Sequence, residues 1–337
     1  MRPTQWTEAE ARCFLEGMKA VATVRGTRPL DSLATEMLEA VQRHVLHATF
    51  DLDGLQDCTP EEMAANIEDP SRRVEFIQFL VLVPYLDMQV DAAQVAVVDE
   101  IANEFGIETD TLTDLHRVRE NRMKRLLYDY GRRSFNEYGE VQGTWDSLKL
   151  VMKSLHQAIG DHKVAERYQA LEGYPEGSLG HTLFHFYRDR GFPLPGESKS
   201  FSELLISHDC CHILGGFNTD MNGEMDVAGF EAGLFDNGFG FELLLEVILD
   251  FHLGKTFTTA GLLPPGTGHF DPEAVMIGYE RGVACNVNPI KGWDFWEVAG
   301  EQVSDLRERY GLPEIPGPVL PPPPAAMETA PEHRHPR

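Results

Sequence analysis

The residues best suited to chemistry lie in one short stretch, "HDCCHILGGFNTDMNGE", which runs from residue 208 to residue 224. His208 and His212 are four residues apart, so on a helix their side chains share one face. Asp209 follows the first histidine, and Glu224 follows a glycine-containing break that can turn the chain back. Imidazoles with carboxylates suit Zn²⁺, whereas a set made only of carboxylates would favour Mg²⁺ or Ca²⁺. The pattern predicts a zinc site, although two buried histidines that are hydrogen-bonded to carboxylates would give the same sequence pattern.

A helix is expected to carry the two histidines. The letters "SELLISHDCCHILGG" end in a glycine pair, which is a common way for a helix to stop. Cys210 and Cys211 are adjacent, and adjacent cysteines rarely close a disulfide, so we expect small buried hydrophobic side chains. Upstream, "HTLFH" places His181 and His185 four apart on a second helix. That pair either lines the same cavity or is structural.

An apolar helix is expected in "FGFELLLEVILDF", after the glutamate. Three acidic residues recur in it at helical spacing, so we expect an amphipathic helix and not a membrane span. Its apolar face either lines an apolar cavity beside the expected metal site or packs in an ordinary hydrophobic core. The residues predicted to line the cavity and bind lipid are Phe241, Leu244, Leu245, Ile248 and Leu249.

Composition limits the partners of the protein. A chain of 337 residues is long enough for about two domains. A net charge of −25 argues against nucleic acid and against electrostatic attachment to anionic lipid, because both need clustered Lys and Arg. A neutral lipid or small organic ligand stays open, with at most peripheral membrane contact. The start does not read as a secretory signal and the five cysteines are sparse, so we expect a cytoplasmic protein with reduced thiols.

The first third of the sequence predicts a helical bundle over residues 1–133. Capping boxes, in which Thr7 pairs with Glu10 and Thr59 with Glu62, mark two helix starts. The first third also contains a weak internal repeat, in which an apolar helix, a short polar turn and a second helix follow one another twice. The second copy, "FLVLVPYLDMQVDAAQVAVVDEIANEFG", resembles the tellurite-resistance TerB-like helical domain, whose repeats place acidic residues in this turn. The residues of the two turns that bear on a metal site are Asp87, Asp91, Gln94, Arg25 and Arg28.

Those turn residues predict that the bundle serves packing or partner binding. Asp87 and Asp91 fit the TerB-like pattern, but Gln94 stands where an acid is expected. Arg25 and Arg28 in the first turn add positive charge beside any cation. We therefore expect residues 1–133 to fold alone and to bind neither calcium nor zinc tightly.

The second half of the chain resembles the coenzyme Q biosynthesis protein 4 family. The run HDxxH, eleven residues and then E is that family's hallmark, and His208, Asp209, His212 and Glu224 match it. The flanks "PEGSLGHTLFHFYRDRGFPLP", "GEMDVAGFEAGLF" and "WDFWEVAGEQVSDLRERYGLPEIP" are also similar to the family. The resemblance implies an all-helical domain with these four residues around a zinc ion. It further implies a role in ubiquinone assembly, acting on a polyprenylated aromatic precursor at ring carbon one, where hydroxyl replaces carboxyl.

Together these observations predict an all-α protein of two domains. Residues 1–133 form the bundle, residues 134–316 form the metal-binding domain, and the proline-rich residues 317–337 form a disordered tail. The expected function is a ubiquinone-biosynthesis-like, metal-dependent decarboxylase or lyase acting on a prenylated hydroxybenzoate, with Asp209 or Glu224 as proton acceptor. One alternative is a non-catalytic prenyl-lipid-binding scaffold that recruits other ubiquinone-pathway enzymes. The other is a zinc hydrolase with His208, His212 and Glu224 as ligands and Asp209 as general base.

Overall fold

The computed structural model describes residues 6–120, 133, 160–200, 203–236, 238–254, 268–315 and 319–323. Across these ranges the chain forms fourteen α-helices and no β-strand, so the all-α prediction is confirmed. None of the described helices is long and apolar enough to cross a membrane.

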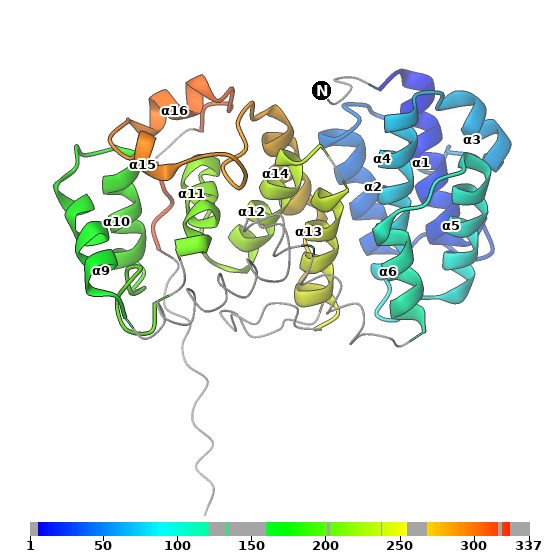
Figure 1. Cartoon of the computed structure of the whole chain (residues 1–337). Helices are drawn as coiled ribbons and strands as arrows, with labels where there is room; N and C mark the ends of the chain where they lie inside the picture. Colours follow the sequence, from blue (N-terminus) through cyan, green and yellow to red (C-terminus); the bar gives the residue numbers. More distant parts are fainter. Residues whose placement is uncertain are drawn as a thin grey trace, which may run out of the picture.

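The N-terminal bundle occupies one end of the molecule (Figure 1). The two predicted capping boxes are present, and they start α1 and α3. The bundle core is aromatic: the Phe14 ring lies 5.2 Å from that of Phe76 and 5.4 Å from that of Phe79. The bundle helices are α1 (Glu8–Thr23), α2 (Ser32–His44), α3 (Pro60–Asn66), α4 (Pro70–Leu82), α5 (Ala92–Phe105) and α6 (Asp110–Arg119), and the 3-10 turn η1 (Val83–Tyr85) follows α4.

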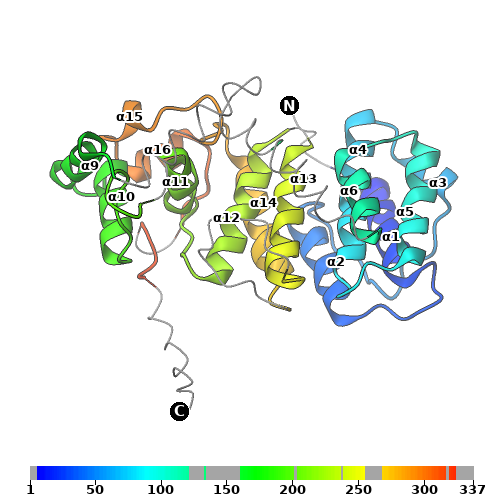
Figure 2. The ribbon, with the colours of Figure 1, turned by 60° about the horizontal axis from the view of Figure 1, so that its bottom comes forward.

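The remaining helices form the other end and the middle of the molecule. Helices α12, α13 and α14 lie between the bundle and helices α9 to α11 in both ribbon views (Figures 1 and 2). The α-helices are α9 (His162–Gln169), α10 (Leu179–Asp189), α11 (Ile206–Gly215), α12 (Met221–Leu234), α13 (Phe239–Val247), α14 (Pro272–Ala284), α15 (Phe295–Val298) and α16 (Val303–Arg309). The 3-10 turns are η2 (Ala170–Gly173) and η3 (Glu203–Leu205), and the π-helical turn η4 (Ile248–His252) continues α13.

Helices α12 and α14 touch backbone to backbone through facing glycines. A Cβ added at Gly229 of α12 would lie 2.1 Å from the carbonyl oxygen of Val275, and one at Gly233 would lie 2.4 Å from that of Tyr279. From the α14 side, a Cβ at Gly278 would lie 1.9 Å from the carbonyl oxygen of Asp226. Only glycine permits this approach, so α14 fixes the position of α12.

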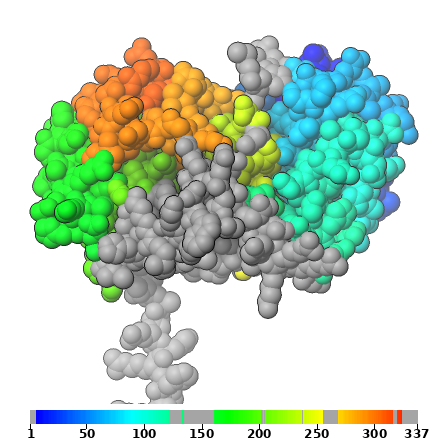
Figure 3. All heavy atoms as spheres, viewed as in Figure 1, coloured from blue at the N-terminus to red at the C-terminus, as the bar shows by residue number. Residues whose placement is uncertain are grey.

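The bundle packs directly against α13 and α14. The ring of Phe79 in α4 lies 5.0 Å from Phe241 of α13 and 5.8 Å from Tyr279 of α14, edge-on to both. At the same boundary, the His44 ring contacts Glu280 at 2.6 Å and Glu273 at 3.1 Å. In the space-filling view the yellow atoms around α13 lie against the blue and cyan atoms of the bundle (Figure 3). The two halves therefore share one continuous buried core.

Asp87 and Asp91, the two aspartates of the turn before α5, are both paired with one arginine. Arg28 of the first turn contacts Asp87 at 2.8 Å and Asp91 at 3.2 Å. Arg25 pairs with Asp57 at 3.0 Å and with Glu100 at 3.2 Å. The guanidinium of Arg28 lies where a cation would have to bind the two aspartates, and this contact supports the expectation that the bundle holds no tight calcium site.

The predicted tail is described only at residues 319–323. There Arg307 donates to the carbonyl of Val319 at 2.8 Å, and Arg190 donates to that of Pro321 at 3.0 Å. Arg307 also donates to the carbonyls of Ile213 and Leu214 at the end of α11. This short proline-rich piece therefore rests on the helical domain. The rest of the predicted tail lies outside the described residues, as does most of the predicted boundary around residue 133.

Candidate metal centre

Helices α11 and α12 bring the two halves of the motif together. Helix α11 ends at Gly215 with a left-handed cap at Gly216, as the glycine pair predicted. Asp220 then caps α12, its side chain accepting from the backbone N–H of Gly223 at 2.9 Å. A Cβ at Gly223 would lie 2.1 Å from the carbonyl oxygen of Asn218, so the turn needs glycine there. This tight turn points the first turn of α12 back at α11.

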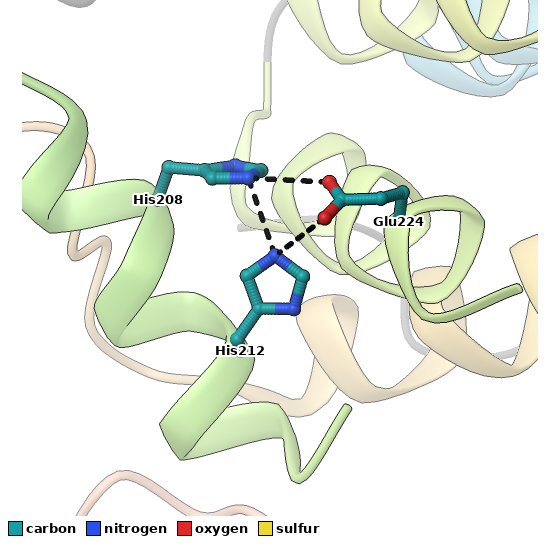
Figure 4. A group of neighbouring side chains, drawn as sticks. All are labelled: His208, His212 and Glu224. Carbon is teal, nitrogen blue, oxygen red and sulfur yellow. Dashed lines mark hydrogen bonds and ion pairs between the residues drawn. The ribbon is translucent and has the colours of Figure 1, made fainter. Parts of the chain in front are cut away.

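Three predicted ligands converge in the space between these helices (Figure 4). The Nε2 atoms of His208 and His212 lie 3.3 Å apart. One oxygen of Glu224 lies 3.5 Å from Nε2 of His208, and the other lies 3.5 Å from Nε2 of His212. Among the described residues, these are the only three that offer metal-ligating atoms all within 4.8 Å of one another.

The spacing of these atoms suits zinc. Two ligand atoms each about 2.1 Å from a tetrahedral zinc ion lie about 3.4 Å apart. The two histidine nitrogens lie 3.3 Å apart, close to that edge, and a different oxygen of Glu224 lies 3.5 Å from each nitrogen. Two histidines and one glutamate also form a set of three protein ligands, which is typical of catalytic zinc sites that keep one position open. The residues present therefore fit the ion that the sequence predicts.

Both histidines are held firmly. Nδ1 of His208 lies 2.8 Å from a carboxylate oxygen of Glu231, whose side chain is 3% exposed. The His212 side chain is 1% exposed, and its ring packs 5.7 Å from the ring of Phe186 in α10. In the described part of the structure, Nδ1 of His212 is buried without a hydrogen-bond partner. Each ring thus directs Nε2 at the shared space.

Asp209 is placed differently from the other three motif residues. Its carboxylate accepts a hydrogen bond from the hydroxyl of Tyr187 in α10 and does not belong to the converging group. Burial raises the pKa of Asp209 to about 6, although the charge of His208 and the Tyr187 bond oppose the rise. Burial also raises the pKa of Tyr187 well above its usual value, and the Asp209 charge adds to this. Asp209 is therefore a buried carboxylate beside the ligands that is ionised above about pH 6.

The site attracts positive charge. For His208, burial acts to lower the pKa, but Glu231 and Glu224 outweigh it and hold the pKa well above its usual value. For Glu224, burial acts to raise the pKa, but His212 and His208 hold it well below its usual value. The carboxylates of Glu231 and Glu224 thus stabilise the protonated ring of His208.

The second histidine pair lies outside this site. The rings of His181 and His185 are 4.6 Å apart on α10. The His185 side chain is half exposed and lies 3.6 Å from Asp189 on its own helix. Neither histidine belongs to the converging group, and of the two interpretations this favours a structural pair.

The predicted lipid-binding residues are all buried. Phe241 packs against Phe79 and Tyr279, which favours core packing for that side chain. A cavity beside the candidate metal site stays a prediction for the others, namely Leu244, Leu245, Ile248 and Leu249, which all belong to the buried core. The adjacent Cys210 and Cys211 are fully buried free thiols, which confirms the prediction that they are small hydrophobic side chains.

Two residues of the site were not predicted from the sequence, namely Glu231 and Tyr187. Glu231 follows Glu224 by seven residues, which is two helical turns, so the spacing alone places both carboxylates on one face of α12. Tyr187 had no comparable signal, because its contact with Asp209 depends on how α10 packs against α11.

Comparisons with known proteins add no family. No family model, no curated protein and no solved structure matches this chain. The site and the sequence motif are therefore the features of the chain that bear on its function.

Proposed function

We propose that this protein binds one zinc ion through His208, His212 and Glu224 and acts at that site on a polyprenylated aromatic precursor. The observation that supports the metal is the convergence of the three ligand groups, with separations of 3.3 to 3.5 Å. The substrate class is supported by the sequence resemblance to the coenzyme Q biosynthesis protein 4 family.

The residues around the site have distinct roles in this proposal. Zinc, when bound, would supply a Lewis acid that polarises a substrate oxygen or activates water. Asp209 lies beside the ligands and is ionised above about pH 6, so it can accept a proton at neutral pH. The hydroxyl of Tyr187 holds that carboxylate in place. The side chains of His208 and Glu224 are 27% and 23% exposed, so a substrate would approach from their side and not from that of His212.

The proposed reaction replaces the ring carboxyl group of a prenylated hydroxybenzoate with a hydroxyl group whose oxygen comes from water. The carboxyl carbon leaves as carbon dioxide, and dioxygen accepts the two electrons removed and becomes hydrogen peroxide. An apolar tail needs no cationic surface for binding, in keeping with the net charge of −25. Release of carboxyl-carbon label from such a substrate in the presence of oxygen would test the reaction. Asp209→Asn should abolish the release but leave zinc bound. A scaffold protein would instead keep its role in a complementation assay when Asp209→Asn is introduced.

A zinc hydrolase is the second candidate, and the ligand set favours it. Two histidines and one glutamate with an open fourth position are the ligands of known zinc peptidases. Asp209 would then be the general base. Release of product from a panel of esters and peptides, lost on chelation and restored by zinc, would support the hydrolase over the decarboxylase.

Metal analysis tests zinc binding, which both candidate functions require. Purified protein should carry close to one zinc per chain, and His208→Ala or His212→Ala should remove it. His181→Ala is the matched control, because His181 belongs to an equally spaced pair on α10 that lies outside the site. Full zinc occupancy in both ligand variants would refute the proposal.

A further inference from the structure

A buried carboxylate stands directly behind one of the candidate ligands. The Glu231 side chain is 3% exposed, and its oxygen lies 2.8 Å from Nδ1 of His208. An ionised carboxylate away from water is unfavourable unless it is paired and hydrogen-bonded, so its retention at this place needs a positive or donating partner. The His208 ring provides that partner.

The contact determines which nitrogen of His208 can bind a metal. A carboxylate accepts hydrogen bonds, so Nδ1 of His208 carries the proton that points to Glu231. The lone pair of a neutral ring is then on Nε2, the atom that faces His212 and Glu224. A carboxylate behind a ligating histidine also raises the basicity of the ligand and fixes the ring orientation.

Helix α12 supplies a ligand and a support from one face. Glu224 and Glu231 are seven residues apart, and both point to α11. One helix face therefore positions both the ligand Glu224 and the carboxylate behind His208.

We infer that Glu231 is the positioning residue of this site, holding His208 in the tautomer and orientation that bind zinc. The inference rests on the proposed zinc site. It assigns Glu231 no contact with the metal or the substrate.

The test uses the full chain and Zn²⁺ alone as the probe. Zinc affinity is measured by chelator competition for wild type, Glu231→Gln and Glu242→Gln. Glu242 is the matched control, since its side chain is 5% exposed and pairs with Arg133 away from the site. Glu231→Gln should weaken zinc binding by about 10- to 100-fold, the effect typical of a carboxylate behind a ligating histidine. Glu242→Gln should leave zinc affinity unchanged.

A spectroscopic measurement separates positioning from general support of the fold. In zinc-loaded protein with ¹⁵N-labelled histidine, NMR should show His208 protonated at Nδ1 and metal-bound at Nε2. Glu231→Ala, which removes the acceptor, should lose this protected Nδ1 proton, whereas Glu242→Ala should keep it.

The outcomes separate the inference from the zinc site itself. Tight zinc binding by both wild type and Glu231→Gln overturns the inference and leaves the zinc site standing. Failure of the wild type to bind zinc overturns the proposed function, and the inference with it. If Glu231→Gln does not fold, Glu231→Asp decides: its shorter side chain should weaken zinc binding, and unchanged affinity overturns the inference.

Discussion

Replacing Gly278 of α14 with alanine should push α14 away from α12, the helix that carries Glu224 and Glu231. The new Cβ would lie 1.9 Å from the carbonyl oxygen of Asp226 and 2.9 Å from the backbone nitrogen of Phe230. Ordinary van der Waals contact begins near 3.4 Å, so the clash with the carbonyl is about 1.5 Å deep. Both colliding atoms belong to backbone, and no change of rotamer can relieve the contact.

The expected loss of stability follows from two opposing effects. Alanine favours a helix over glycine by about 1 kcal/mol. Overpacking a tight core typically costs about 1–3 kcal/mol, occasionally more, and a backbone clash belongs at the upper end. The net expectation is a loss of about 2 kcal/mol in the free energy of unfolding. Because α12 carries Glu224 and Glu231, the same displacement should weaken zinc binding.

Urea unfolding and a zinc titration measure the two effects. Gly173→Ala is the matched control, because a Cβ there meets no atom within 4 Å. That variant should remain within about 0.5 kcal/mol of wild type, as is usual for surface substitutions. If Gly278→Ala is as stable as Gly173→Ala and binds zinc as well, the close contact between α12 and α14 does not exist as described.

Four further predictions concern the site and its neighbours. Because Glu231 and Glu224 hold the pKa of His208 well above its usual value, protons should compete with zinc up to and above neutral pH, so zinc affinity should rise with pH in a chelator competition series. The same raised pKa should stabilise the metal-free protein below about pH 6.5, and this contribution should be lost as the pH rises through the pKa of His208 in the folded protein. If the difference in free energy of unfolding between metal-free wild type and His208→Ala does not change with pH, the prediction is wrong. Leu245→Trp should lower the binding of a prenylated phenol in a partition assay without loss of zinc, and unchanged binding would place the ligand elsewhere. A fragment of residues 1–133 should unfold cooperatively, but it should be less stable than in the full chain because Phe79 loses its contact with Phe241. It should bind no calcium at micromolar concentrations because Arg28 already pairs with Asp87 and Asp91, and a calorimetric titration that shows such binding would contradict this.

Local signals were sufficient to predict several helix ends and three members of the site. Capping boxes and a glycine stop act within a few residues, so the starts of α1 and α3 and the end of α11 could be predicted correctly. The histidine pair and Glu224 are close in sequence, and a single tight turn brings them together. Such features depend little on the rest of the fold.

Contacts between distant segments could not be predicted in the same way. Tyr187 meets Asp209 only because α10 packs on α11, and Phe79 meets Phe241 across 162 positions of sequence. Composition suggests a boundary near residue 133, yet the packing of α4 against α13 makes the core continuous across it. Propensity and periodicity describe one helix at a time, and neither states which helix faces which.

Helix α12 combines a local signal in its sequence with contacts to distant segments of the chain. At 100° per residue, Glu224 and Glu231 point within about 20° of one another, whereas Gly229 and Gly233 point roughly 140° to 180° away from Glu224. One face therefore holds the ligand and its support against α11, and the opposite face lies against α14. A helix buried on both sides shows no single apolar stripe, so periodicity indicates a helix here without indicating its orientation. The glycine spacing supplies that orientation: once Gly229 and Gly233 lie against the backbone of α14, the two glutamates lie on the opposite face, which in this structure meets α11.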